Sequence, residues 1–406
     1  MERVDAAEAG FDPERLARID SFLAERYFEP ELLAGAQLLV AREGKVVHFS
    51  TAGKARAGGG PMGEDALFRI ASMTKPITSI AFMMLVEEGR ATLDQAVDSV
   101  VPEWKELGVY DGGGAGVPFR VKPAERPMMM IDLLRHTSGL TYSFQHRTNV
   151  DAAYRETKIE RWHGELDLDG FVAALADIPL EFSPGTAWNY SVSTDVLGLV
   201  VERVSGMKLD RFFDERIFGP LGMADTAFHV PAEKTDRLGD CWAFEQGKGA
   251  VLYDKGGQSA WSKPPRLLAG GAGLVSTVSD YHRFCSMLLN GGELDGARIV
   301  GRKTLELMTS NHLPGGADLT QMSRSLFSEA VNAGQGFGLG FGVNLDPAKT
   351  MLPGSKGEYY WGGMFSTAFF VDPVERLHMI FMTQLMPSST YPIRRQLKTL
   401  IYSALR

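Results

Sequence analysis

Ser72-Met73-Thr74-Lys75 is the stretch of this 406-residue chain that decides its fold. A serine stands three residues before a lysine, and apolar residues at helical spacing continue over 77–86. Residues three apart lie on one face of a helix, so the hydroxyl and the amine can reach each other. A serine hydroxyl is a weak nucleophile until a base takes its proton, and a neighbouring lysine can help to take it. The motif therefore predicts a serine enzyme that works without a catalytic histidine.

A second S-x-x-K, Ser205-Gly206-Met207-Lys208, makes the motif weak when taken alone. Ser205 follows an apolar helical stretch, with Gly206 placed as its C-terminal cap, and would face the negative end of the helix dipole. Ser72 instead precedes its helix, as Pro76 indicates, because proline is tolerated only near the first turn. Free N–H groups at that end favour an alkoxide and an oxyanion. We therefore predict Ser72 as the nucleophile; the alternative is a plain helix N-cap with its lysine in solvent.

The composition is that of a globular protein with no basic surface for nucleic acid. Hydrophobic residues make up 44% and charged residues 23% of the chain, and the net charge is −8. The sequence has two cysteines, Cys241 and Cys285, which favours reduced thiols over a disulfide framework. The N-terminus lacks the apolar core of a signal peptide, and no run is long enough to span a membrane. We expect a cytoplasmic protein with a small-molecule ester substrate and without nucleic acid or membrane partners.

Metal chemistry is not expected either, because the eight histidines are scattered without a paired metal-binding motif. We therefore predict no cofactor and no metal site. The sequence contains no coiled-coil heptads, so it does not indicate the oligomeric state.

The pattern along the chain predicts an α/β domain built from both chain ends around a helical middle. Residues 11–27 follow the spacing of an amphipathic helix, 36–41 and 45–50 indicate a hairpin, and 393–405 indicate a closing helix. Strand character returns at 337–343, 366–371 and 377–383. The predicted division is 1–100 plus 265–406 for the α/β domain and 101–264 for a mostly helical inserted domain. The active site is expected at their junction, where pockets are common.

Two glycine-rich segments carry no phosphate-binding motif. Residues 336–342 alternate glycine with apolar residues and match neither G-x-G-x-x-G nor a P-loop, so we predict a strand. Gly112-Gly113-Gly114 predicts a loop.

Four further motifs follow the serine motif along the chain. They are Leu133-Leu134-Arg135-His136-Thr137-Ser138-Gly139-Leu140, then Phe182-Ser183-Pro184-Gly185 leading to Tyr190-Ser191, then Gly271-Ala272-Gly273-Leu274-Val275-Ser276-Thr277, and finally Trp361-Gly362-Gly363. In this order the set resembles the serine β-lactamase and penicillin-binding-protein superfamily, and more narrowly the family VIII carboxylesterases. The resemblance implies a fold like that of class C β-lactamases, an antiparallel sheet flanked by helices with an inserted, mostly helical domain.

The chain departs from the class C β-lactamase pattern at two places. Tyr190-Ser191-Val192 lacks the asparagine of Tyr-x-Asn, which would hold a substrate amide. Trp361-Gly362-Gly363 stands where those enzymes carry Lys-Thr-Gly, so the cation that pairs with a β-lactam carboxylate is missing. A buried carboxylate without a partner is costly. Neutral esters are therefore expected to fit better than penicillins.

The resemblance implies a catalytic set of Ser72, Lys75 and Tyr190. Ser72 would attack the ester carbonyl, and the backbone N–H groups of Ser72 and Met364 would form the oxyanion hole. The base is left open between a neutral Lys75, whose pKa would have to fall from about 10.4, and a Tyr190 phenolate favoured by a charged lysine, which is slightly preferred. The predicted substrate-binding residues are Trp361, Gly362, Gly363 and Tyr142.

The expected activity is hydrolysis of small to medium carboxylic esters through an acyl-enzyme on Ser72, with Lys75 and Tyr190 as general base and acid. The alternatives are transfer of the acyl group to an alcohol or amine, β-lactamase or DD-peptidase-like activity on β-lactams, and a non-catalytic binding protein. An α/β-hydrolase is disfavoured, because the chain has no G-x-S-x-G.

Overall fold

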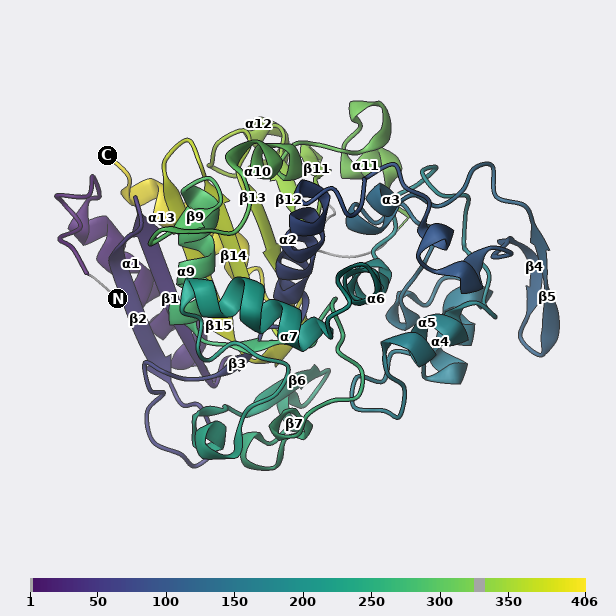
Figure 1. Cartoon of the computed structure of the whole chain (residues 1–406). Helices are drawn as coiled ribbons and strands as arrows, with labels where there is room; N and C mark the ends of the chain where they lie inside the picture. The colour runs from purple at the N-terminus through teal and green to yellow at the C-terminus, as the bar shows by residue number, and fades with distance from the viewer. Residues whose placement is uncertain (1–2, 325–332) are drawn as a thin grey trace.

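The computed structural model describes residues 3–324 and 333–406. Within these residues the centre is a seven-stranded antiparallel sheet in the order β11-β12-β13-β14-β15-β1-β2 (Figure 1). Its strands are β1 (Gly35–Arg42), β2 (Lys45–Gly53), β11 (Gln335–Phe337), β12 (Gly342–Asn344), β13 (Tyr359–Gly362), β14 (Ala368–Asp372) and β15 (Leu377–Thr383). β1 pairs with β15, for example Leu39 with Ile380, so strands from the two ends of the chain lie side by side in the sheet.

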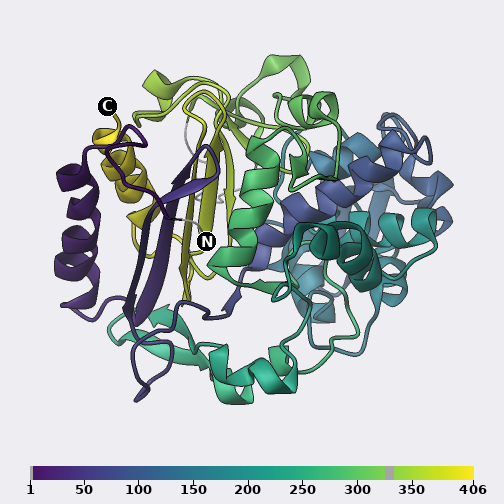
Figure 2. The same ribbon diagram turned by 60° about the vertical axis from the view of Figure 1, so that its left-hand side comes forward.

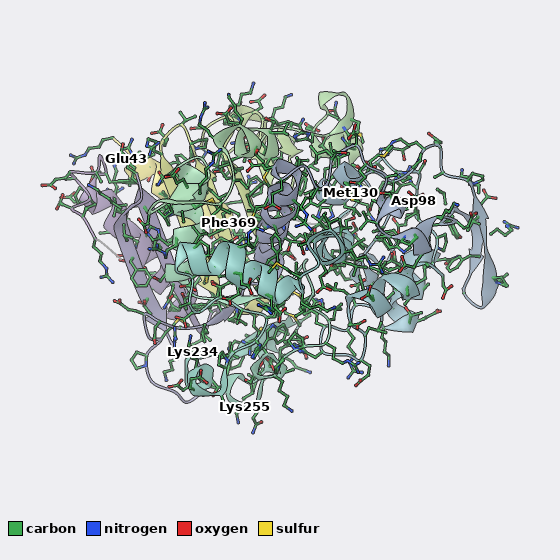
Figure 3. The ribbon with its side chains drawn as sticks, viewed as in Figure 1. Glu43, Asp98, Met130, Lys234, Lys255 and Phe369 are labelled. Carbon is green, nitrogen blue, oxygen red and sulfur yellow. The ribbon has the colours of Figure 1, made fainter. Side chains whose placement is uncertain are left out.

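Helices cover both faces of this sheet (Figure 2). α1 (Pro13–Leu23) and α13 (Ile393–Ala404) pack together on one face, and α9 (Val278–Leu289) lies on the other. All residues of β15 are buried, as expected for a continuous apolar run in a strand with both faces covered. Figure 3 shows Phe369 of β14 inside the molecule, whereas the exposed Glu43 and Lys255 lie at its edge.

A mostly helical region lies beside the sheet, and α2 (Thr74–Glu87) is buried between the two (Figure 1). Every residue from Thr74 to Leu85 is buried, because this helix packs against α6 (Ser193–Ser205) as well as against the sheet side. The other helices of this region are α3 (Met130–Leu134), α4 (Asn149–Thr157), α5 (Leu168–Leu175), α7 (Leu209–Phe213) and α8 (Gly219–Leu221). Two hairpins join them, β4 (Val109–Gly114) with β5 (Val117–Lys122) and β6 (Cys241–Glu245) with β7 (Gly249–Asp254).

The remaining elements are short. They are β3 (Phe68–Arg69), β8 (Val275–Ser276), β9 (Glu293–Leu294), β10 (Ala297–Arg298), β16 (Leu385–Met386), α10 (Arg302–Met308), α11 (Leu319–Met322) and α12 (Pro347–Thr350).

The predicted fold class is confirmed: an antiparallel sheet flanked by helices, with a mostly helical segment between the strands that the two chain ends supply. One apolar core runs through both parts, since it includes Ile80 of α2, Leu199 of α6 and Ile380 of β15. The division into separate domains at residues 100 and 265 stays a prediction from the sequence.

Both glycine-rich segments differ from the prediction. Residues 337–343 do not form one strand, because the chain turns back after Phe337 and β11 pairs with β12. Gly340 in this turn has a φ of +97°, and a Cβ there would lie 2.3 Å from Ser79 Oγ, so only glycine fits against α2. The triple glycine 112–114, predicted as a loop, belongs to β4, where irregularities interrupt the register with β5. Glycine adopts either strand or turn backbone, so its spacing alone cannot separate the two.

Cys241 and Cys285 are free and buried. Burial raises the pKa of the Cys241 thiol to about 12 and that of Cys285 well above its ordinary value, which makes both poor nucleophiles. Among the helices of the described residues, none is long and apolar enough to cross a membrane.

A buried histidine pair makes the fold sensitive to acid. His282 Nδ1 of α9 and His378 Nε2 of β15 lie 2.8 Å apart. Burial lowers the pKa of His282 to about 4 and that of His378 well below 6.5. The folded protein therefore keeps both rings neutral while the unfolded chain takes up protons below about pH 6.5. The free energy of unfolding is thus at its full value above that pH and falls as the pH drops toward 4.

We expect denaturant titrations to show this loss between pH 6.5 and 4, with His282 alone contributing on the order of 3 kcal/mol. His282→Asn should flatten the slope of stability against pH in that window. His146→Asn is the control, because His146 is exposed. Equal slopes for the wild type and His282→Asn would contradict the prediction.

Candidate active site

Ser72 lies on a short 3₁₀ turn, Ala71–Met73, between β3 and α2. Ala71 has a φ of +44°, an unfavourable backbone conformation for a residue with a side chain, and it turns the strand sharply into the helix. The first N–H groups of a helix have no partner within it. Because Ser72 lies at the start of α2, the positive end of the helix dipole and the backbone N–H of Ser72 are both close to its hydroxyl.

The three side chains predicted as catalytic meet at one oxygen. Tyr190 Oη donates a hydrogen bond to Ser72 Oγ at 2.7 Å, and Lys75 Nζ lies 3.3 Å from the same atom. Tyr190 comes from the segment just before α6, far from Ser72 in sequence. Lys75 is 1% and Tyr190 2% exposed, so packing holds both side chains in place.

Lys75 has two further partners. Its Nζ donates to Tyr142 Oη at 3.0 Å and to the Gly271 carbonyl at 2.7 Å. Burial lowers the pKa of Lys75 to about 7, although the carboxyls of Asp195 and Glu160 act in the opposite direction. A large share of the amine is therefore neutral near pH 7, and only a neutral amine can accept a proton.

Tyr190 shows the opposite behaviour. Burial raises the pKa of Tyr190 above its ordinary value, and side-chain hydrogen bonds with Ser72 and Trp361 offset only part of this rise. Near pH 7 Tyr190 therefore keeps its proton and acts as a donor. The raised pKa of Tyr190 and the lowered pKa of Lys75 therefore favour Lys75 as the base over the Tyr190 phenolate, which the sequence analysis slightly preferred.

The end of β13 approaches the serine through two glycines. A Cβ on Gly363 would lie 2.4 Å from the Ile70 carbonyl, and one on Gly362 would lie 2.6 Å from Arg394 Cζ. The backbone can come this close only without side chains. Met364 follows and, like Ser72, lines the cavity described below. Within residues 3–324 and 333–406 its N–H has no recorded acceptor, as an oxyanion donor requires.

Ser72, Tyr142, Tyr190 and Met364 open into one cavity of about 1110 Å³. Its walls are rich in aromatic side chains: Phe144, Tyr154, Trp162, Phe244, Tyr253 and Trp261. Three cationic side chains, Arg155, Lys158 and Arg161, also line it. This volume is at the upper end of the range for small-molecule sites, so a bulky substrate can enter.

Trp361, Gly362 and Gly363, predicted to bind substrate, are not among the residues that line this cavity. Trp361 is 2% exposed and packs against Tyr190, with ring centroids 5.5 Å apart. It therefore supports the ring of Tyr190. Tyr142 does line the cavity as predicted. A sequence motif does not show which side of a strand faces a cavity, so a role of these three residues in substrate binding stays a prediction.

Arg394 of α13 supplies a half-buried cation that no motif indicated. Its Nη2 donates to the carbonyls of Gly363 and Thr367, at 2.7 Å each, on either side of the turn that carries Met364. Burial lowers the pKa of Arg394 to about 9, and its charge acts to lower the pKa of Tyr190. This guanidinium is held by the backbone, so it braces the turn rather than reaching into the cavity.

Sequence reasoning also missed two carboxyls near Lys75, the buried Asp195 and the half-buried Glu160. Asp195 Oδ1 accepts from the Gly271 N–H at 2.9 Å. Glu160 accepts from the backbone N–H of Ser143 at 2.6 Å and from its hydroxyl at 2.9 Å. Burial raises the pKa of both, that of Glu160 to about 7. Neither belongs to a spacing pattern, so only their burial beside the lysine identifies them.

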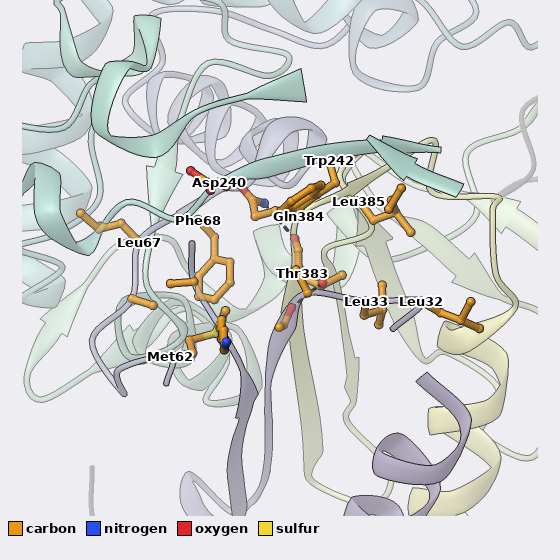
Figure 4. A pocket seen from close by; sticks show the side chains of 17 residues that line it. Leu32, Leu33, Met62, Leu67, Phe68, Asp240, Trp242, Thr383, Gln384 and Leu385 are labelled. Carbon is orange, nitrogen blue, oxygen red and sulfur yellow. Dashed lines mark hydrogen bonds between the residues drawn. The ribbon is translucent and has the colours of Figure 1, made fainter. Parts of the chain in front are cut away.

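The second S-x-x-K does not form a site. Ser205 Oγ contacts the Glu202 carbonyl, and Lys208 Nζ bonds the Glu202 carboxylate at 2.8 Å instead of the serine. A separate small pocket at the end of the sheet, lined by Leu33, Phe68 and Leu385 among others, has a volume of about 10 Å³ (Figure 4). That space suits about one water, so it is no substrate site. In the described parts of the chain no group of three His, Cys, Asp or Glu residues could hold a metal ion.

A family model described as Beta-lactamase matches residues 24–402. The chain belongs to the β-lactamase family. It is 36% identical to Protein Rv1367c of Mycobacterium tuberculosis over 360 residues, which cover 88% of this chain and 87% of that protein. It is 31% identical to Esterase EstB of Burkholderia gladioli over 386 residues, 90% of each chain. The structure of EstCE1, described as a hydrolase with promiscuous acyltransferase activity, has a TM-score of 0.78 at 24% identity and covers 96% of this chain and 99% of its own.

These comparisons confirm the resemblance predicted from the motifs. As a member of the β-lactamase family, this protein is a serine hydrolase. Its relatives include an esterase, and an identity of 31% over most of both chains is high enough to show the family. The likeness to EstCE1 shows the fold alone.

The close approach of β13 to Ile70 can be tested with Gly363→Ala in this β-lactamase-family protein. The new Cβ would lie 2.3 Å from Thr367 Oγ1 and 2.4 Å from the Ile70 carbonyl, so the strand end must move. We expect a destabilisation of about 1–3 kcal/mol and a loss of roughly 100-fold in ester turnover, since one oxyanion donor moves away. Gly60→Ala is the control, because nothing lies within 4 Å of its Cβ. Thermal unfolding and ester kinetics measure both effects; wild-type turnover in Gly363→Ala would contradict the placement.

Proposed function

We propose that this protein is a carboxylesterase that hydrolyses carboxylic esters through an acyl-enzyme on Ser72. The observation that carries the proposal is the position of Ser72 Oγ, 2.7 Å from Tyr190 Oη and 3.3 Å from Lys75 Nζ, at the wall of a large cavity. The kinship with Esterase EstB supports an ester as the substrate.

In the proposed acylation, neutral Lys75 takes the proton of Ser72 Oγ while that oxygen attacks the ester carbonyl carbon. The N–H groups of Ser72 and Met364 bind the oxyanion, and each such donor is typically worth about 100–1,000-fold in rate. When the tetrahedral intermediate collapses, the leaving alcohol takes a proton from the Tyr190 hydroxyl. The Lys75 ammonium then gives its proton to Tyr190, which restores both residues. A water molecule then repeats the attack on the acyl group, with the same residues returning Ser72 to its starting state.

The cavity supports bulkier substrates than the small to medium esters expected from the sequence. About 1110 Å³ with aromatic walls favours esters with a large apolar or aromatic acyl or alcohol group. β-Lactam hydrolysis is proposed at most as a side activity. Trp361 stands where class C β-lactamases carry a lysine, and Arg394 is held by two backbone carbonyls and does not line the cavity. The cations of the cavity wall, Arg155, Lys158 and Arg161, belong to the helical region.

Acyl transfer is the second candidate, and the same roomy cavity favours it, because an alcohol can lie beside the acyl-enzyme in place of water. EstCE1 combines hydrolysis with acyl transfer by its description. Product analysis with a bulky p-nitrophenyl ester, with and without an alcohol acceptor, separates the two. A new ester as the main product would favour the transferase, and free acid in both samples would favour the esterase.

The two S-x-x-K motifs form a matched pair for testing the nucleophile. We expect Ser72→Ala to lower p-nitrophenyl ester turnover by at least about 1,000-fold, since the attacking oxygen is removed. Ser205→Ala should retain nearly all activity. Intact-mass spectrometry should find a single acyl adduct, mapped to the peptide that contains Ser72. Full activity in Ser72→Ala would eliminate the mechanism.

The pH dependence tests Lys75 as the base. The pKa of Lys75 is about 7, so below pH 7 the amine is protonated and cannot take the serine proton. We expect kcat/KM for a neutral ester to be constant above about pH 7 and to fall about tenfold per pH unit below it, which gives the profile an acid limb. Lys208→Met, in the second S-x-x-K, should leave this limb in place. A rate that stays constant from pH 5 to 9 would rule out this role for Lys75.

A further inference from the structure

Asp195 places a buried carboxylate against Gly271, the same residue whose carbonyl is a partner of Lys75. It lies in the first turn of α6 and is 5% exposed. Its Oδ1 accepts from the Gly271 N–H at 2.9 Å, and the Gly271 carbonyl accepts from Lys75 Nζ at 2.7 Å. One glycine therefore joins the carboxylate to the amine.

The space around Gly271 is shaped for this carboxylate. A Cβ on Gly271 would lie 2.5 Å from Asp195 Oδ2 and 3.0 Å from its Cγ, so the carboxylate occupies the volume that a side chain would need. The preceding Gly270 is clamped in the same way, since its Cβ would lie 2.8 Å from the Thr194 carbonyl. Thr78 Oγ1 of α2 donates to the Gly270 carbonyl at 2.6 Å. The segment is therefore held from α6 on one side and from α2 on the other.

Charge links the two groups as well. In the described parts of the chain the Asp195 carboxylate forms no ion pair with Lys, Arg or His, and its hydrogen bond is to the Gly271 N–H. The Asp195 charge acts to raise the pKa of Lys75, and the Lys75 charge acts to lower the pKa of Asp195, while burial opposes both. A buried charge without a counter-charge is costly, so each group stabilises the charged form of the other.

We propose that Asp195 is a positioning residue of the reaction, which fixes the Gly271 carbonyl that orients Lys75 and balances the positive charge formed when Lys75 takes the proton of Ser72. This inference rests on the proposed roles of Ser72 and Lys75. The proton moves from Ser72 Oγ to Lys75 Nζ, and Asp195 neither gains nor loses one. The other titratable groups that interact with Lys75 are Tyr142, Tyr190, His136 and Glu160.

Asp195→Asn separates charge from position, because the amide oxygen can still accept from the Gly271 N–H while the charge is gone. Without that charge the ammonium is less stable, so the acid limb of the pH profile should move to lower pH by about 1 unit. The acylation rate above the limb should fall by roughly tenfold, since a less basic amine takes the serine proton less readily. KM should stay the same, because Asp195 does not line the cavity.

Asp280→Asn is the matched control. Asp280 lies in the first turn of α9, is 6% exposed and accepts from a backbone N–H, that of Asp225, at 2.7 Å. The Asp280→Asn change therefore removes a carboxylate of the same kind away from Lys75, while its amide oxygen can still accept from the Asp225 N–H. We expect this variant to change thermal stability only and to keep the wild-type acid limb.

The experiment measures the rate of Ser72 labelling by a fluorophosphonate between pH 5 and 9, by intact mass, together with kcat and KM for a p-nitrophenyl ester. The labelling rate constant refers to folded sites, so partial unfolding does not distort it. Asp195→Ser, a smaller neutral variant, should show the same shift if Asp195→Asn does not fold. A wild-type acid limb and labelling rate in the neutral variants, with stability alone reduced, would overturn the inference. A wild-type protein whose Ser72 is not labelled would overturn the proposed function instead.

Discussion

A lysine amine buried 3.3 Å from a serine oxygen is the constraint on which the rest of the site depends. Removing an ammonium from water costs several kcal/mol unless its hydrogen bonds are replaced. Here three oxygens surround Lys75 Nζ, and they belong to Ser72, Tyr142 and Gly271, which come from three distant segments. The helix that carries the lysine must therefore pack against the helical region and against the segment before β8 at the same time. The apolar core that runs through both regions meets this requirement.

Glycine makes these close approaches possible. Gly271 leaves room for the Asp195 carboxylate, and Gly363 brings the end of β13 against Ile70. In each case a backbone group reaches the reaction centre because no side chain stands in its place. The fold is that of the β-lactamase family, but Trp361 stands where class C β-lactamases carry a lysine. Trp361 packs against Tyr190 and Arg394 braces the Met364 turn, and the cavity is lined by aromatic side chains together with the cations Arg155, Lys158 and Arg161.

Much of the fold could be predicted because its signals are local. Hydrophobic spacing indicated the buried helix after Ser72, the β1–β2 hairpin and the closing helix α13. The glycine-rich segment 336–342 was assigned wrongly, because pairing within the sheet decides whether such a stretch turns. The substrate-binding role of Trp361 stays a prediction: the motif shows that the residue is near the site, whereas the packing of β13 decides which way it faces.

The sequence by itself determined the family, the helix that begins after Ser72 and the grouping of Ser72, Lys75 and Tyr190, since a motif at the start of an apolar helix carries that information. The tertiary structure decided the protonation of these groups. Desolvation lowers the pKa of Lys75 and raises that of Tyr190, and its extent depends on burial that no spacing records. It also brought Asp195, Glu160 and Arg394 to the site, because charges act through space and not along the chain.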